Sequence, residues 1–278
     1  MAENKRFFYG WLILLTCILI MGLGYAPLVS CASLFTKPVT EDLGFTRSGY
    51  ALVSTIAALM MAFMSPFIGK IMSKPYMHKA LVVCMIGNCL AYYCYSFAST
   101  LPQFYVTAAC IGFFECGSTM IPVSVLITNW FRKKRGLVMS IAMVGSSIGG
   151  TILSPIIGNL IASQGWRFTY KAVGITRLVI LVPLVLLVIR RTPADMGTKA
   201  YGADEEGETG KARKTEREWN VSLKEVKKKP MFWCFVLGCT LISATAAVIT
   251  QIPASVMDAG YATTTAASIA SLYLFIRS

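Results

Sequence analysis

Residues 11–34 read WLILLTCILIMGLGYAPLVSCASL and contain no charged side chain. A helix needs about 20 consecutive apolar residues to cross the hydrocarbon core of a bilayer. Similar runs follow at roughly 49–71, 80–98, 103–127, 136–161, 168–189 and 231–252, and one more begins near residue 262. Backbone polar groups in lipid must be satisfied within the chain, and helices achieve this. The sequence therefore predicts an all-α, multi-pass membrane protein.

The composition supports this prediction. Hydrophobic residues make up 55% of the chain, charged residues only 14%, and the mean hydropathy is +0.62. The net charge of +13 does not indicate nucleic acid, because the basic residues gather at the ends of the apolar runs. The nine cysteines lie almost wholly within those runs and show no metal-ligand spacing. We expect the lipid bilayer as a partner, no nucleic acid, no metal and no cofactor.

Lysines and arginines accumulate in every second connector. The basic clusters are Lys70, Lys74 and Lys79; Arg132, Lys133, Lys134 and Arg135; and Arg190 and Arg191. Cytoplasmic loops carry the excess of positive charge, so the N-terminus is predicted to be cytoplasmic. Residues 190–230 are rich in charge and too poor in apolar residues to fold alone, which predicts a solvated linker. Ser222 and Glu225 have the spacing of a capping box, so a short interfacial helix and a simple tether both stay open.

Several segments resemble the oxalate/formate antiporter-like, monocarboxylate-type branch of the major facilitator superfamily. They are NWFRKKRG at 129–136, PADMG at 193–197, SLFTKP at 33–38 in the expected first outer loop, and QIP at 251–253. The resemblance implies two six-helix halves that rock about a central site. It assigns 1–189 to the first half, 190–230 to the cytoplasmic linker, and 231–278 to helix seven and part of helix eight. The sequence then looks truncated after the seventh helix.

The same resemblance suggests gating and packing residues. The connector after the second run matches a family gating loop only in part, because Ser73 and Tyr76 stand where an acidic residue and a glycine are expected. The fifth run has small residues at four-residue spacing and a proline, which indicates either simple close packing or a face that slides during transport. The full set is Gly69, Lys70, Lys74, Arg132, Arg135, Gly136, Gly145, Gly149, Gly150, Pro155 and Gly158.

Two ionisable residues, Glu115 and Arg177, fall well inside apolar runs. A charge near the bilayer centre costs on the order of 3 kcal/mol, so such groups usually face a cavity or a partner. One hypothesis is that Glu115, with Ser118 on the same turn, faces the central cavity and binds a proton or orients substrate. The alternatives are a structural ion pair and a snorkelling Arg177. The other substrate-lining candidates are Tyr25, Ser30, Ser33 and Gln251.

No enzyme motif is present, and the chain lacks the phosphate-binding Gly-Lys-Ser/Thr loop of an ATP-driven pump. The resemblance implies a secondary active transporter of a small organic anion, a mono- or dicarboxylate, in the plasma membrane. Alternating access by uniport, proton symport or antiport all remain open. One alternative is a half-bundle fragment that does not transport. A seven-helix receptor is the other, and the predicted cytoplasmic N-terminus argues against it.

Overall fold

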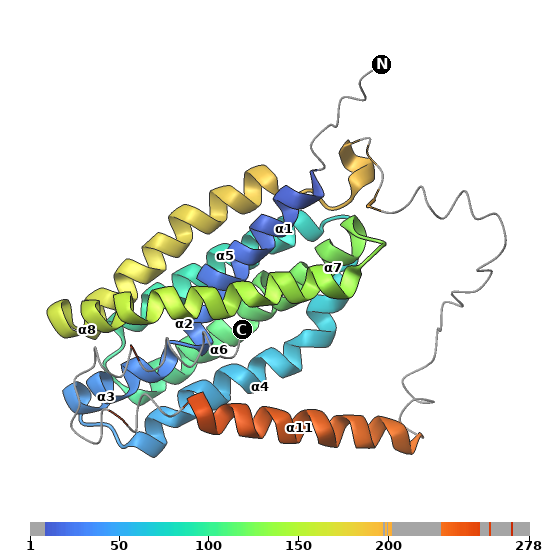
Figure 1. The fold of residues 1–278 in the computed structure, drawn as a ribbon. Coiled ribbons are helices and arrows are strands. Elements are labelled where there is room, and N and C mark those ends of the chain that lie inside the picture. Colours follow the sequence, from blue (N-terminus) through green and yellow to red (C-terminus); the bar gives the residue numbers. More distant parts are fainter. Residues whose placement is uncertain are drawn as a thin grey trace, which may run out of the picture.

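The computed structural model describes residues 9–196, 198, 200–201, 229–250, 256 and 268. Helices dominate this part of the chain (Figure 1). The first span consists of α1 (Gly10–Leu19), the π-helix η1 (Ile20–Tyr25), α2 (Ala26–Val29) and α3 (Ala32–Leu43). The following elements are α4 (Arg47–Met72), α5 (Met77–Cys94), η2 (Tyr95–Phe97), α6 (Leu101–Ser118), α7 (Met120–Trp130), α8 (Arg135–Val188), η3 (Pro193–Met196) and α11 (Pro230–Thr250).

Five helical stretches of the described chain are long and apolar enough to cross a membrane: Gly10–Leu43, Arg47–Met72, Met77–Phe97, Leu101–Trp130 and Arg135–Val188. The last has 54 residues, so a straight helix would measure about 81 Å, far more than a bilayer core. Gly165 interrupts it with φ 81 and ψ 165, and the chain turns back there (Figure 1). The stretch therefore makes two crossings, as the two separate predicted runs at 136–161 and 168–189 require.

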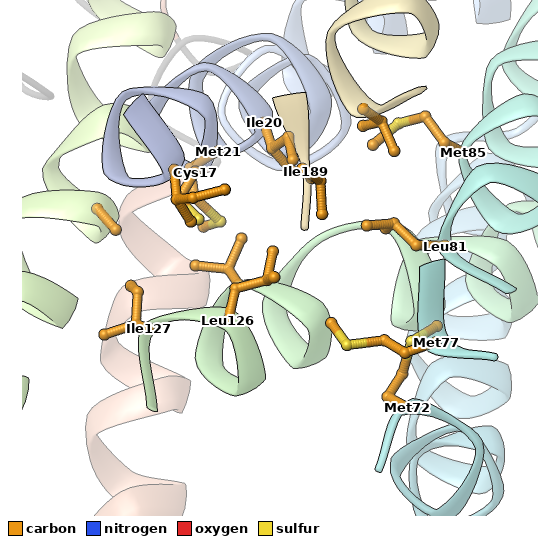
Figure 2. Close-up of a cluster of buried hydrophobic side chains, with 14 of the residues drawn as sticks. Cys17, Ile20, Met21, Met72, Met77, Leu81, Met85, Leu126, Ile127 and Ile189 are labelled. Carbon is orange, nitrogen blue, oxygen red and sulfur yellow. The ribbon is translucent and has the colours of Figure 1, made fainter. Parts of the chain in front are cut away.

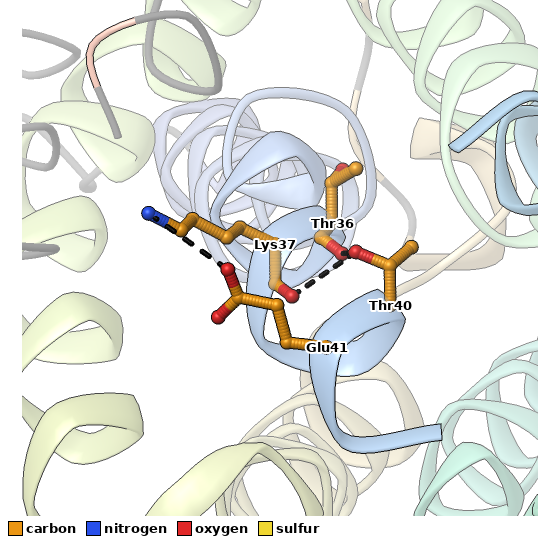
Figure 3. A network of polar contacts seen from close by, with 4 residues as sticks. All are labelled: Thr36, Lys37, Thr40 and Glu41. Atoms are coloured by element: carbon orange, nitrogen blue, oxygen red, sulfur yellow. Dashed lines mark hydrogen bonds and ion pairs between the residues drawn. The ribbon is translucent and has the colours of Figure 1, made fainter. Parts of the chain in front are cut away.

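The first span is longer than predicted. We expected residues 33–38 in an outer loop, and this was wrong, because α3 continues to Leu43. Lys37 Nζ lies 3.9 Å from Glu41 Oε1, and the Thr40 hydroxyl donates to the carbonyl oxygens of Thr36 and Lys37 at 2.8 and 3.1 Å (Figure 3). Gly44, with φ 67, ends the helix in a left-handed conformation. The helix therefore continues through the charged residues, with Lys37 half-buried and Glu41 and Asp42 exposed.

Two buried clusters hold the bundle together at different levels. One cluster is aliphatic and sulfur-rich and joins the first span to α5, α7 and the end of α8; Figure 2 shows Cys17, Ile20, Met21, Met77, Leu81, Met85, Leu126, Ile127 and Ile189 among its members. The other cluster is aromatic and joins α3, α4, α5, α6 and α8. Its rings include Phe35, Tyr50, Tyr92, Tyr95, Phe104, Trp166 and Tyr170. Buried polar side chains also occur in the bundle, among them Asn88, Glu115, Thr119 and Arg177.

The predicted fourth run is also divided. α6 ends at Ser118, Thr119 has φ −122 and ψ −93, and α7 begins at Met120. The predicted capping box in the linker, residue Gln251 and the predicted eighth helix lie outside the described residues.

Candidate functional site

Glu115 lies in the last turn of α6 and is 5% exposed. Both of its carboxylate oxygens accept hydrogen bonds. Asn88 Nδ2 of α5 donates to Oε2 at 2.7 Å, and the Thr119 hydroxyl donates to Oε1 at 2.9 Å. Thr119 reaches the carboxylate because it stands four residues later, at the break between α6 and α7. The break therefore helps to hold the buried carboxyl group.

Arg177 lies in the second half of α8 and is 2% exposed. Its Nη2 donates to Asn88 Oδ1 and to the main-chain oxygen of Gly24, the latter at 2.8 Å. Its Cζ lies 5.0 Å from the ring centroid of Tyr92, which is a cation–π contact. This degree of burial does not fit a snorkelling arginine, because snorkelling would place the guanidinium at the water interface.

Asn88 connects the two charged residues. It is fully buried and uses both ends of its amide, donating to Glu115 and accepting from Arg177. No ion pair in the described part of the chain joins Glu115 directly to Arg177. We name Gly24, Asn88, Glu115, Thr119 and Arg177 the polar network. It ties the first span to α5, α6 and α8, and it balances a negative against a positive charge in a medium where an isolated charge is costly.

Sequence reasoning identified Glu115, Arg177 and Ser118 but did not single out Tyr92 or Gly24. Tyr92 stands beside Tyr93 in α5, and nothing in the surrounding sequence distinguishes it. Gly24 contributes only its carbonyl oxygen, and every residue has one. The available signal was the interruption of the first apolar run by glycines, because Gly24 lies in the π-helix η1.

The remaining substrate-lining candidates are Ser118 of α6, three residues of the first span, and Gln251. Ser118 is buried and donates to the carbonyl oxygen of Glu115 at 3.3 Å, so the structure brings these two residues together. Tyr25 ends η1 and Ser30 follows α2, and both side chains are half-buried. Ser33 of α3 is buried, and its hydroxyl has no hydrogen-bond partner in the described structure. Gln251 lies outside the described residues.

The glycines of the fifth run pack against the first span. A Cβ added to Gly145 would lie 2.5 Å from the carbonyl oxygen of Ile18, and one added to Gly149 would overlap the backbone of Gly22. Gly22 in turn faces the carbonyl oxygen of Gly145, at 3.0 Å from an added Cβ. We name Ile18, Gly22, Gly145 and Gly149 the glycine seam. Of the other candidates on this helix, Gly150 and Gly158 are buried and Pro155 is half-buried.

The predicted gating residues lie in two connectors and in the helix ends beside them, Gly69 and Lys70 in the last turn of α4 and Arg135 and Gly136 in the first turn of α8. Lys70, Lys74, Arg132, Arg135 and Gly136 are exposed, and Gly69 is half-buried. Arg135 Nε donates to the carbonyl oxygen of Phe131 at 2.9 Å. Trp130 Nε1 donates to the carbonyl oxygen of Arg190 at 2.9 Å, and Arg191 donates to that of Ser73 at 2.9 Å. Hydrogen bonds therefore join the three connectors that carry the basic clusters. Among the described residues, no three His, Cys, Asp or Glu side chains form a group that could hold a metal ion.

Comparisons with known proteins agree with this architecture. A family model described as Major Facilitator Superfamily matches residues 12–277. Human monocarboxylate transporter 2 is 24% identical over 229 residues, which cover 81% of this chain and 45% of that protein. Chicken monocarboxylate transporter 4 is 26% identical over 170 residues, covering 60% of this chain and 35% of the relative. The MFS-type transporter pynF of Aspergillus niger is 27% identical over 192 residues, covering 66% and 43%.

A solved structure has the same fold. It is that of a bacterial homologue of the human lysosomal transporter Spinster, in an inward-facing and unoccupied conformation. The TM-score is 0.76 at 16% sequence identity, and the match covers 98% of this chain and 60% of that one. The chain spans less than half the length of each of the two monocarboxylate transporters and of the Aspergillus niger transporter. Because the family model matches nearly the whole sequence, the chain belongs to the major facilitator superfamily, as its resemblance to the monocarboxylate-type branch predicted.

Proposed function

We propose that this protein is part of a secondary active transporter of a small organic anion, a mono- or dicarboxylate, that works by alternating access. The observation that carries the proposal is the similarity to monocarboxylate transporters over 81% of the chain. The polar network is consistent with it. A buried carboxyl group and a buried guanidinium are costly in a membrane interior and are usually kept there for function.

In this proposal residues 1–189 form one six-helix half, 190–230 form a cytoplasmic linker, and 231–278 begin the second half. Glu115 binds a proton or orients the substrate, and Ser118 lies beside it. Tyr25, Ser30, Ser33 and Gln251 are proposed to line the substrate path. The glycine seam is proposed to let helices slide past each other, since small residues allow close backbone approach. We further propose that the protein resides in the plasma membrane with a cytoplasmic N-terminus.

Uptake into proteoliposomes tests the transport proposal. The purified 278-residue chain is reconstituted, and the accumulation of radiolabelled acetate, lactate and oxalate is measured with and without an imposed pH gradient. We expect uptake of at least one anion above that of protein-free liposomes. Folded, reconstituted protein that takes up none of them would contradict transport by this chain and favour the half-bundle that does not transport.

An epitope tag before residue 1 tests the orientation separately. Antibody should reach the tag on whole cells only after the plasma membrane is permeabilised. Labelling of intact cells would contradict the cytoplasmic N-terminus and would reopen the seven-helix receptor.

A further inference from the structure

Arg177 carries N–H groups that have no acceptor in the described part of the chain. Nη2 is paired with Gly24 and Asn88, but Nε and Nη1 have no hydrogen-bond partner among the described residues, although the side chain is only 2% exposed. Buried charged donors are normally paired, because leaving one unpaired loses its hydration without replacement. The unpaired groups therefore point to a missing acceptor, and a guanidinium pairs best with an anion such as a carboxylate.

Tyr92, whose ring contacts the Arg177 guanidinium, carries a second unpaired donor. Its buried hydroxyl has no hydrogen-bond partner among the described residues. The acceptors nearby are already in use, because Asn88 Oδ1 accepts from Arg177 and both carboxylate oxygens of Glu115 accept hydrogen bonds. The two side chains thus offer donors that have no acceptor in the described structure, and one of them is a cation.

We propose that Arg177 and Tyr92 form an internal subsite for a carboxylate group of a small organic anion, and that Glu115 competes with this anion for the positive charge of Arg177. The ligand class rests on the proposed function. The position of the subsite rests on the unpaired buried groups alone.

The polar network explains how the competition would work. While Glu115 is ionised, it balances the charge of Arg177 through Asn88. Protonation removes that negative charge, and an incoming carboxylate then restores the balance. Binding of the proton and binding of the anion should therefore favour each other, since coupling between two sites is reciprocal. Lower pH should tighten anion binding.

Among the described residues, the other titratable groups around Glu115 do not supply a competing carboxylate. They are Cys89 and Tyr92 of α5, Cys116 of α6 and Arg177 of α8. The residues contributed by η1 and α4, Gly24 and Ser65, do not titrate. Glu115 is thus the carboxyl group whose replacement should remove the pH dependence.

Binding of sodium acetate to the purified 278-residue chain tests the subsite. Saturation-transfer NMR at constant ionic strength gives the dissociation constant at an acidic and at a neutral pH. We expect wild-type protein to bind more tightly at acidic pH, by about fivefold or more. Glu115→Gln should bind tightly at both pH values, since the amide still accepts from Asn88 but carries no charge. Arg177→Gln should lose binding, and Tyr92→Phe should weaken it.

Arg167→Gln is the matched control. It removes an arginine from the same helix, one that donates to Ser96 and Ser99 instead of the polar network, and it should bind acetate as wild type does. Tighter binding by Glu115→Gln cannot come from misfolding, so the test holds even if Arg177→Gln is unstable. Unchanged affinity in Glu115→Gln, or retained binding in folded Arg177→Gln, would overturn the subsite. If the chain takes up an anion but does not show this binding pattern, only the subsite proposal is contradicted. If it shows the binding pattern but takes up no anion, only the transport proposal is contradicted.

Discussion

The glycine seam and the polar network both fasten the first span to the rest of the bundle, but by opposite means. At the seam, Gly145 and Gly149 bring two backbones together with no side chain between them. In the network, Arg177 and Asn88 reach across the space between helices with long polar groups. Close backbone packing depends on shape and tolerates no added atoms. Hydrogen-bonded packing depends on chemistry and should tolerate replacements that keep the donors and acceptors.

The largest effect is expected at the seam. Gly149→Leu places a side chain where the backbone of Gly22 already lies, so the first span and α8 must separate. Overpacking of this kind costs about 3 kcal/mol or more in a site that cannot relax. The loss of stability is measured as the thermal unfolding midpoint in detergent, with size-exclusion chromatography as the readout of folded protein. Gly136→Ala is the control, because an added Cβ there meets nothing within 4 Å. Equal midpoints for the two variants would show that the seam is not tightly packed.

A smaller loss is expected in the network. Asn88→Leu keeps the number and branching of the side-chain heavy atoms but removes a donor to Glu115 and an acceptor from Arg177. Each charged group keeps one other partner, Thr119 or Gly24, so we expect a loss of about 1–3 kcal/mol. The same unfolding measurement applies, with exposed Asn159→Leu as the control. A stability equal to wild type would mean that the amide bridge contributes nothing to folding.

The aromatic cluster offers a test of a residue that combines ring packing with a hydrogen bond. Trp166 Nε1 donates to Asp42 Oδ2 at 3.0 Å, while its ring packs against Phe104 and Tyr170. Trp166→Phe keeps an aromatic ring and loses the donor, which should cost about 1 kcal/mol. Adding Asp42→Ala should then cause little further loss in a double-mutant cycle. Additive losses would show that the hydrogen bond is not the basis of the effect.

The smallest effect is expected at the surface pair of α3. Lys37 and Glu41 lie 3.9 Å apart at i, i+4 spacing, and the Glu41 side chain is 66% exposed (Figure 3). Such pairs contribute about 0.3–0.5 kcal/mol. A double-mutant cycle of Lys37→Ala and Glu41→Ala measures the coupling, and raising the salt concentration should reduce it. A coupling energy as large as the stability lost in Asn88→Leu would contradict the view that burial gives the polar network its strength.

The sequence predicted the helices well because the length of an apolar run that crosses a membrane is set by the thickness of the bilayer. It failed at residues 33–43, where Lys37, Glu41 and Asp42 lowered the hydropathy although the helix continues through them. The charged members of the site were predictable for the same reason that the helices were, since Glu115 and Arg177 stand out in apolar surroundings. The connection between them was not. Asn88 connects them only once α5 lies between α6 and α8, and Gly24 contributes through its backbone.

The π-helix at Ile20–Tyr25 has a consequence for reading the first span in any related chain. A turn of this kind holds more residues than an α-helical turn, so it shifts the phase of every side chain that follows by roughly 100° per inserted residue. Residues before Ile20 and after Tyr25 therefore do not share one helical wheel. An alignment-based search for positions that point toward the interior of the bundle should restart its register at Ala26.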